Sequence, residues 1–297
     1  MRSHWRHVST LFAVLAGVVT PPLMPDRAAA VDGITYASAL SPSNSSSTRT
    51  AEAFCPADTR AIGGGAIFSG SNRIIVEGAF PRERSFVVTA AEPTGGIRGD
   101  WYIVALAICA PDRSLPGLER IEFISRIGSE TPKLASQTCS NGKSLIGIGG
   151  AVEGDSLALG HLALTGVRAS SDLQTVTVQG GTPDGESSGG NWVLRGVALC
   201  VNRVPDQQFV QAASALNATD RKSAHALCPT GTKIHSLGFD FTARRGELYA
   251  TSLIPHNILA TTGTQGVDVE AVEAGSGFVV SGSDAQWLIR AQGICAR

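Results

Sequence analysis

The stretch GDWYIVALAICA, residues 99–110, decides the fold of this chain. Its side chains alternate between two faces, which places Trp101, Ile103, Ala105, Ala107 and Cys109 together on one of them. Alternation of this kind is typical of a β-strand. The small residues between the tryptophan and the cysteine leave room for another element to pack against that face.

The same strand pattern occurs twice more along the chain. NWVLRGVALC places Trp192 eight residues before Cys200, and QWLIRAQGIC places Trp287 eight residues before Cys295. A tryptophan at this fixed distance from a cysteine is therefore expected to be a core residue. All three tryptophans should occupy equivalent buried positions.

Two further elements recur in the same order. CPADTRAIGGGA, CSNGKSLIGIGGA and CPTGTKIHSLGF each carry a glycine ten residues after the cysteine, and the strand-like segments ITYASAL, IEFISRI and QFVQAASAL precede them. Three anchors recurring at a period of about 86 residues indicate a threefold internal repeat. The segments expected are a signal peptide at 1–30 and β repeats at 31–113, 114–204 and 205–297.

Residues 1–30 have the pattern of an export signal. Arg2 and Arg6 precede the apolar run VSTLFAVLAGVVT, and the small residues Ala28, Ala29 and Ala30 form a cleavage site. The run is too short to span a bilayer, and no other apolar run is long enough. We therefore expect a secreted, extracellular protein that is not an integral membrane protein.

The six cysteines all follow residue 30, and an even count in an exported chain predicts disulfides. Six cysteines allow fifteen pairings, so the sequence alone does not select one. One bridge per repeat is favoured, and a cyclic pattern that links neighbouring repeats is the alternative. The favoured pairing is Cys55–Cys109, Cys139–Cys200 and Cys228–Cys295.

Charge and composition narrow the class of protein. The whole chain has a formal net charge of −1, and without residues 1–30 it has 21 basic and 24 acidic residues. No basic surplus is present to bind phosphates, so nucleic acid is not an expected partner. Abundant glycine and short β-branched runs predict an all-β fold with about five strands per repeat. We expect a β-prism-like arrangement of three pseudo-symmetric antiparallel sheets, with three small sandwiches in a row as the alternative.

The repeat resembles one found in secreted proteins of high-GC Gram-positive bacteria, of the form CPxGTxxxGGGA…W…AxAxC. The resemblance covers nearly all of the chain after residue 30. It is weaker in the second repeat, where Ser140 replaces the proline, and in the third, where HSLGF replaces the glycine run. It implies an exported, disulfide-bonded β protein and supplies no catalytic residues. The three-sheet architecture is also similar to that of β-prism proteins, many of which bind sugars.

Motifs for catalysis and metal binding are weak. GESSGGN at 185–191 and VTAAE at 88–92 are superficially similar to a trypsin-like protease, but Glu92 stands where the catalytic histidine would be needed. His235 takes the position that Ile62 and Ile146 hold in the other repeats, which favours a buried, hydrogen-bonded core histidine over a catalytic one. We expect no enzyme activity, no cofactor and no metal site.

The repeats differ in the loops between the shared glycine and the shared tryptophan, and loops on a rigid scaffold commonly carry recognition. The alternative is that these loops are solvated turns. The candidate binding residues are Arg82, Arg84, Asp184, Glu186, Arg244 and Arg245.

The favoured function is a non-enzymatic extracellular binding protein, including a subunit of a secreted assembly, with another secreted protein or a cell-surface glycan as partner. The alternative is a lectin-like carbohydrate binder, and a hydrolase or a degenerate trypsin-like fold is less favoured. An interaction subunit should have an unpaired strand edge or an exposed apolar patch. A lectin should have acidic or amide-rich loop pockets repeated with the symmetry, and an enzyme should have a histidine or carboxylate pair in one cleft.

Overall fold

The computed structural model describes residues 31–70, 73–93, 95–155, 161–182, 189–243, 248–256, 264–273 and 286–297. Within these ranges the chain forms 18 β-strands and one short 3-10 turn, η1 (Asp112–Ser114). The expectation of an all-β protein is confirmed. The expected signal peptide at 1–30 lies outside the described residues.

Each of the three expected repeat ranges holds six strands. The first holds β1 (Thr35–Leu40), β2 (Thr48–Phe54), β3 (Thr59–Ser69), β4 (Ile75–Pro81), β5 (Ser85–Ala91) and β6 (Tyr102–Pro111). The second holds β7 (Glu119–Ile124), β8 (Lys133–Thr138), β9 (Lys143–Gly154), β10 (Ala163–Ala169), β11 (Thr175–Gly181) and β12 (Trp192–Asn202). The third holds β13 (Gln208–Ala213), β14 (Arg221–Leu227), β15 (Lys233–Ala243), β16 (Leu248–His256), β17 (Gly266–Glu273) and β18 (Trp287–Ala296).

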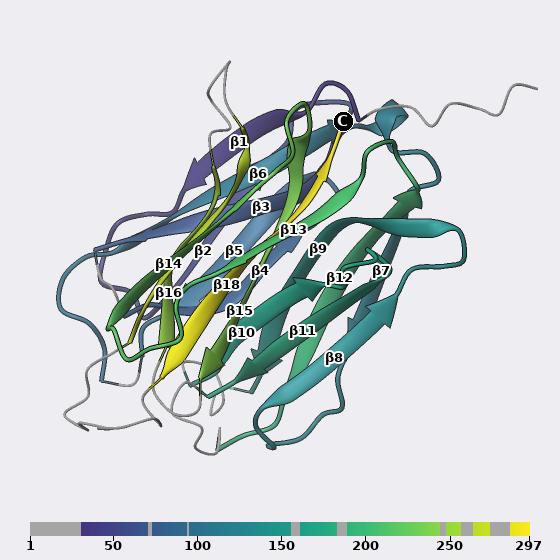
Figure 1. Cartoon of the computed structure of the whole chain (residues 1–297). Coiled ribbons are helices and arrows are strands. Elements are labelled where there is room, and N and C mark those ends of the chain that lie inside the picture. The colour runs from purple at the N-terminus through teal and green to yellow at the C-terminus, as the bar shows by residue number, and fades with distance from the viewer. Residues whose placement is uncertain are drawn as a thin grey trace, which may run out of the picture.

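The strands of the described residues form three six-stranded antiparallel sheets, and their orders follow one rule. Each sheet takes the first, sixth and third strands of one range and continues into the fourth, fifth and second strands of another. The orders are β1-β6-β3-β16-β17-β14, β7-β12-β9-β4-β5-β2 and β13-β18-β15-β10-β11-β8. This threefold, β-prism-like arrangement matches the expected fold class. Figure 1 shows the long strands running side by side along the molecule.

Each range holds six strands where about five were expected, and each sheet is shared between two ranges. The halves of each sheet join through only two residue pairs. At the β4–β9 junction these are Gly78 with Ala151 and Ala79 with Gly150, and β3–β16 and β10–β15 join in the same way. Glycine allows this close approach, because a Cβ on Gly78 would lie 2.7 Å from Thr89 Oγ1 and 3.0 Å from the Ala151 side chain.

The third strands of the three ranges meet in the centre of the molecule. Each has a bulge there, at Ile62, Ile146 and His235, and all three residues are fully buried. The backbones are in close contact, since a Cβ on Gly147 would lie 2.1 Å from the Ile62 carbonyl oxygen. Ile62, Ile146 and His235, which align with one another in the three repeats, therefore occupy equivalent positions in the closely packed core.

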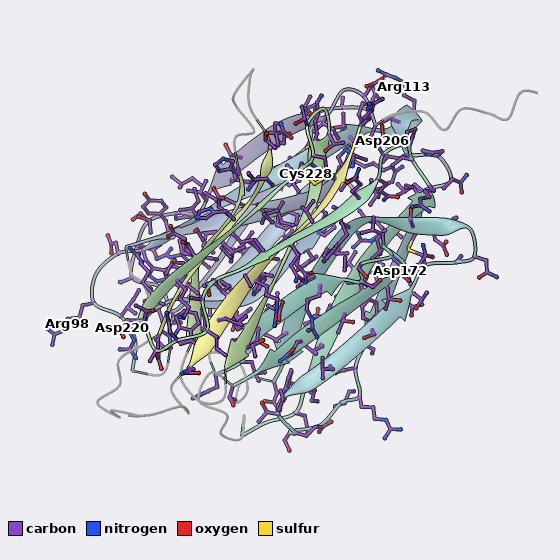
Figure 2. The ribbon with its side chains drawn as sticks, viewed as in Figure 1. Arg98, Arg113, Asp172, Asp206, Asp220 and Cys228 are labelled. Atoms are coloured by element: carbon purple, nitrogen blue, oxygen red, sulfur yellow. A yellow bond between two sulfur atoms is a disulfide. The ribbon has the colours of Figure 1, made fainter. Side chains whose placement is uncertain are left out.

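The two ends of the molecule differ chemically. The sixth strand of each range runs from a tryptophan to a cysteine, so the tryptophans lie at one end and the disulfides at the other. In Figure 2, Cys228 and Asp206 lie near one end of the long axis and Arg98 and Asp220 near the opposite end. We call these the disulfide end and the tryptophan end.

The structure confirms the expected disulfides and tryptophan burial. Cys55–Cys109, Cys139–Cys200 and Cys228–Cys295 are bonded, with Cα–Cα distances of 5.6, 5.8 and 5.8 Å. Trp101, Trp192 and Trp287 are 0, 1 and 0% exposed. The expected strands at ITYASAL, IEFISRI and QFVQAASAL correspond to β1, β7 and β13.

Candidate functional site

The predicted loop residues Arg82 and Arg84 lie in the turn between β4 and β5, at the disulfide end. Arg82 Nη1 is 3.2 Å from Glu52 Oε1, and Arg84 Nη2 donates to the Pro56 carbonyl at 2.9 Å. Both arginines therefore have partners within their own range. The other four predicted residues, Asp184, Glu186, Arg244 and Arg245, lie outside the described residues. The binding role of this set stays a prediction.

Glu92, which took the place of a protease histidine in the sequence, has a packing role. Its Oε1 accepts a hydrogen bond from Trp101 Nε1 at 2.9 Å, and its Oε2 accepts one from the Ile97 amide at 3.3 Å. The carboxylate thus fixes the tryptophan of the first range. Ser187 and Ser188, the serines of the protease-like motif, lie outside the described residues.

Two histidines that are 31 residues apart in the sequence share one carboxylate. Asp268 on β17 lies between His225 on β14 and His256 on β16, with each Nδ1 2.6 Å from one carboxylate oxygen. The sequence did not indicate that His225, Asp268 and His256 lie together, because they are on three different strands. Among the described residues no group of three histidine, cysteine or acidic side chains is arranged to hold a metal ion.

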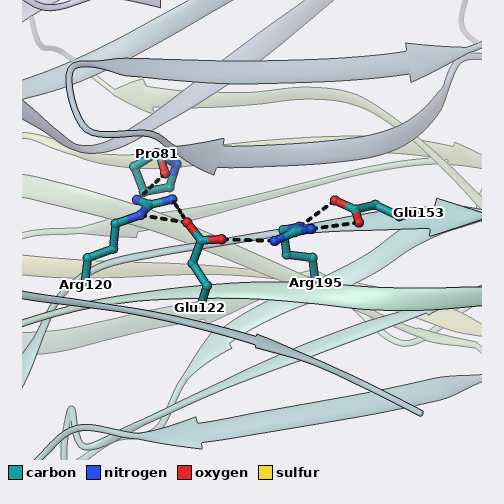
Figure 3. A network of polar contacts seen from close by, with 5 residues as sticks. All are labelled: Pro81, Arg120, Glu122, Glu153 and Arg195. Carbon is teal, nitrogen blue, oxygen red and sulfur yellow. Dashed lines mark hydrogen bonds and ion pairs between the residues drawn. The ribbon is translucent and has the colours of Figure 1, made fainter. Parts of the chain in front are cut away.

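A row of alternating charges crosses the sheet formed by β7, β12 and β9 (Figure 3). Arg195 lies between two carboxylates, with Nε 2.5 Å from Glu153 Oε1 and Nη1 3.0 Å from Glu122 Oε2. Arg120 binds the other side of Glu122 at 2.8 Å and donates to the Pro81 carbonyl. These contacts lower the pKa of Glu122, with the Arg120 hydrogen bond as the largest cause. Every charge in the row has a partner, so the row stabilises the sheet surface and leaves little charge for a ligand.

A buried cation lies over each of the three core tryptophans. Arg49 Cζ lies 4.6 Å from the Trp101 ring centroid, Lys133 Nζ lies 4.5 Å from that of Trp192, and Lys222 Nζ lies 4.8 Å from that of Trp287. The three cations are 6, 5 and 5% exposed. A cation over an indole face is attracted by the ring quadrupole. Burial also lowers the pKa of Lys222, and the charge of Glu273 opposes that shift.

Each buried cation holds the turn that joins the first two strands of its range. Lys133 Nζ donates to the carbonyls of Arg126 and Gly128, both at 3.0 Å. In the first range Arg49 donates to Pro42 and Asn44 on either side of Ser43. In the third range Lys222 donates to the Ala215 carbonyl at 3.1 Å and to the Asn217 side chain on either side of Leu216. The residue at the tip of each turn is therefore held in place and points toward solvent.

One of these turns carries a group of exposed aliphatic side chains. Ile124 ends β7, Ile127 is the tip of the turn, and Leu134 is the second residue of β8. They are 59, 73 and 58% exposed. We call these three residues the apolar corner. Because Lys133 fixes the turn, the corner is a preorganised apolar surface and not a loose loop.

The three buried cations that hold the turns could have been found in the sequence. A basic residue stands six positions before the first cysteine of each range, as Arg49, Lys133 and Lys222. A serine stands fourteen positions before the same cysteines, and its hydroxyl accepts a hydrogen bond from the sixth strand, as Ser125 does from the Leu194 amide at 2.9 Å. The apolar corner gives no such signal, because single exposed aliphatic residues are common.

Taken together, the fold and the surface define a disulfide-bonded, all-β protein with a rigid scaffold and an exposed apolar corner. No protein-family model matches the chain, and the search of curated proteins gave no match either. Within the described part of the chain, no helix has the length and apolar character needed to cross a membrane.

Proposed function

We propose that this chain is an exported protein that acts by binding another macromolecule through the apolar corner, and not by catalysis. The single observation that supports this most directly is the exposure of Ile124, Ile127 and Leu134 at one fixed junction. An interaction subunit is expected to have such a surface.

The free energy of burying aliphatic side chains favours binding of a partner at the apolar corner. Burying an aliphatic side chain contributes about 1.5–3 kcal/mol. Ile127 is held between two carbonyls that Lys133 binds, so little conformational entropy is lost when a partner covers it. Three such side chains supply the apolar centre of a small interface.

Export is part of the proposal and rests on two observations. The first thirty residues have the composition of a signal peptide. Three disulfides are also compatible with an oxidising compartment. The expected partner is therefore another secreted protein.

The test is a comparative pull-down from culture supernatant of the source organism. Tagged wild-type chain, Ile127→Asp and Ser43→Asp are incubated with the supernatant, and bound proteins are quantified by mass spectrometry. Ser43 is the matched control, because it is the tip residue of the equivalent turn in the first range. We expect at least one protein to be depleted about tenfold or more with Ile127→Asp and retained with Ser43→Asp, which corresponds to about 1.4 kcal/mol or more. If every captured protein is retained equally by all three baits, the apolar corner is not the binding surface.

A further inference from the structure

We propose that β8 binds an extended, uncharged segment of the partner as an added strand. This inference rests on the proposed function and names the chemistry of the partner. β8 is the last strand of its sheet and pairs with β11 on one side only. Figure 1 shows it at the margin of the molecule.

The register determines which backbone groups of β8 face outward. The Cys139 amide donates to the Gln174 carbonyl at 2.9 Å, and Cys139 directly follows β8. In an antiparallel ladder, residues that bond to the neighbouring strand alternate with residues that do not. Gln137 and Ala135 therefore bond to β11, and the backbone groups of Leu134, Ser136 and Thr138 point away from it.

The outward-facing residues of β8 are also those with exposed side chains. Leu134, Ser136 and Thr138 are exposed, whereas Ala135 and Gln137 are partly buried. The Thr138 carbonyl accepts a hydrogen bond from Gln137 Nε2 at 3.0 Å, so the amides of all three residues and the carbonyls of Leu134 and Ser136 are left for a partner. Such a row of backbone groups is complementary to another extended strand.

The two equivalent edges in the other ranges are protected by charge, and β8 is not. The Cys55 and Cys228 amides also donate to the neighbouring strand, so the same alternation identifies the outward-facing residues of β2 and β14. At the position of Ser136, β2 carries Glu52 and β14 carries His225, and the exposed Arg221 on the same side of β14 supplies a charge to that edge. Edge strands commonly avoid unwanted pairing by carrying charged side chains. The basic residue of β8, Lys133, is buried and its ammonium group is bound by carbonyls.

The neighbouring strand shows which side chains suit this edge. Ser136 Oγ is 2.9 Å from Thr177 Oγ1, and Thr138 Oγ1 is 2.9 Å from Thr175 Oγ1. β11 itself is uncharged and alternates threonine with valine. A charged side chain laid over this surface would lose water without meeting a counter-ion. The partner segment is therefore uncharged, with hydroxyl or β-branched side chains and an aliphatic residue beside Leu134.

The experiment uses a peptide probe with the sequence LQTVTVQG, residues 173–180 of this chain, capped at both ends and labelled at its N-terminus. Binding to the purified chain is measured by fluorescence anisotropy. Ser136→Pro removes an outward amide and leaves the ladder to β11 intact, since proline is tolerated where an edge N–H faces solvent. Ser223→Pro on β14 is the matched control, because Ser223 also lies on an outward-facing edge position. If Ser136→Pro lowers the melting temperature, Ser136→Lys makes the same test with a charge, and Ser223→Lys is its control.

We expect saturable binding to the wild-type chain, at least tenfold weaker binding to Ser136→Pro, and a change of less than twofold with Ser223→Pro. Absence of saturable binding to the wild type, or equal losses in both variants, would overturn the inference. A wild-type dimer that Ser136→Pro converts to a monomer would assign the edge to a second copy and would also overturn it. If Ser136→Pro still retains the protein captured through Ile127, the added-strand inference fails while the proposed function stands.

Discussion

Lys133 Nζ lies 4.5 Å from the centroid of the Trp192 ring and donates a hydrogen bond to the carbonyl of the same tryptophan at 2.6 Å. Lys133 is on β8 and Trp192 is on β12, which belong to different sheets. Three carbonyl oxygens and an indole face thus replace the hydration of a lysine that is only 5% exposed. The pair joins two sheets at the corner where the proposed partner binds.

Replacing Lys133 with methionine should destabilise the protein by about 3 kcal/mol, because it removes three charge-assisted hydrogen bonds and the cation over the Trp192 ring. The measurement is the free energy of unfolding from urea titration. Lys133→Arg is the control, since Arg49 makes the corresponding contacts in the first range, and it should retain most of the stability. Equal losses in the two variants would show that the shape of lysine, and not its charge, stabilises the turn.

Replacing Arg195 with methionine should cost about 1 kcal/mol or less, even though Arg195 has two acidic partners (Figure 3). Its side chain is 34% exposed and its partners Glu122 and Glu153 are 43 and 44% exposed, so water screens the ion pairs. The loss should shrink in 1 M salt. A loss as large as that of Lys133→Met would contradict this reading, which assigns the larger effect to the buried cation.

Replacing His235 with isoleucine should raise stability most at acid pH. Burial lowers the pKa of His235 to about 3, with a smaller effect from Lys233, and neither ring nitrogen has a hydrogen-bond partner in the structure. Between its ordinary pKa of 6.5 and about 3, the unfolded chain binds a proton here that the folded chain does not. The free energy of unfolding should therefore fall with decreasing pH by up to about 1.4 kcal/mol per unit.

The pH dependence is measured by urea unfolding at several pH values between 3 and 8. His235→Ile should reduce the slope of the free energy of unfolding against pH below pH 6.5 by the amount due to one proton. The isoleucine should fit, because Ile62 and Ile146 hold the equivalent positions. Ile146→His is the reverse variant and should steepen the slope. An unchanged slope in both variants would contradict the assignment of acid sensitivity to this central position.

Removing the Cys139–Cys200 disulfide by a double substitution to alanine should destabilise the protein by about 4 kcal/mol. The bonded residues are 61 positions apart, and the chain-entropy treatment gives a loss of this size for a loop of that length. The same urea titration measures it. A loss below about 1 kcal/mol would indicate that the reduced, unfolded chain keeps this loop closed by other contacts.

Much of the architecture could be predicted, because short sequence patterns identify the sixth strand and recur in each range. The Trp-to-Cys spacing fixed the sixth strand of each range, and the recurrence of that spacing predicted the disulfide pairing that the structure confirms. The alignment of His235 with two isoleucines also predicted its burial. The expected hydrogen bond is wrong, because the surrounding core offers neither ring nitrogen a partner. The sixth strand depends on residues close together in the chain, where alternation and spacing are direct signals. The disulfide pairing and the burial of His235 could be predicted because the same local pattern recurs three times.

The exchange of strands between ranges could not be predicted in this way. Each junction rests on two residue pairs, such as Gly166 with Asp240 and Val167 with Phe239, and strand patterns do not specify which strand pairs with which. The apolar corner was missed for a related reason. Ile124, Ile127 and Leu134 become a group only when a buried lysine folds the turn back between β7 and β8.

The most direct test of the account measures the affinity of the partner recovered in the pull-down. The chain with Ile124, Ile127 and Leu134 all changed to serine is compared with wild type by calorimetry. The control has Leu40, Leu216 and Phe54 changed to serine, because all three are exposed apolar residues. Leu40 and Leu216 lie at the corresponding corners of the other ranges, and Phe54 lies at the disulfide end. We predict that the first variant weakens binding at least 100-fold, equivalent to about 2.7 kcal/mol, and that the control changes it less than threefold. Equal affinities for the first variant and wild type would contradict the claim that this corner is the binding surface.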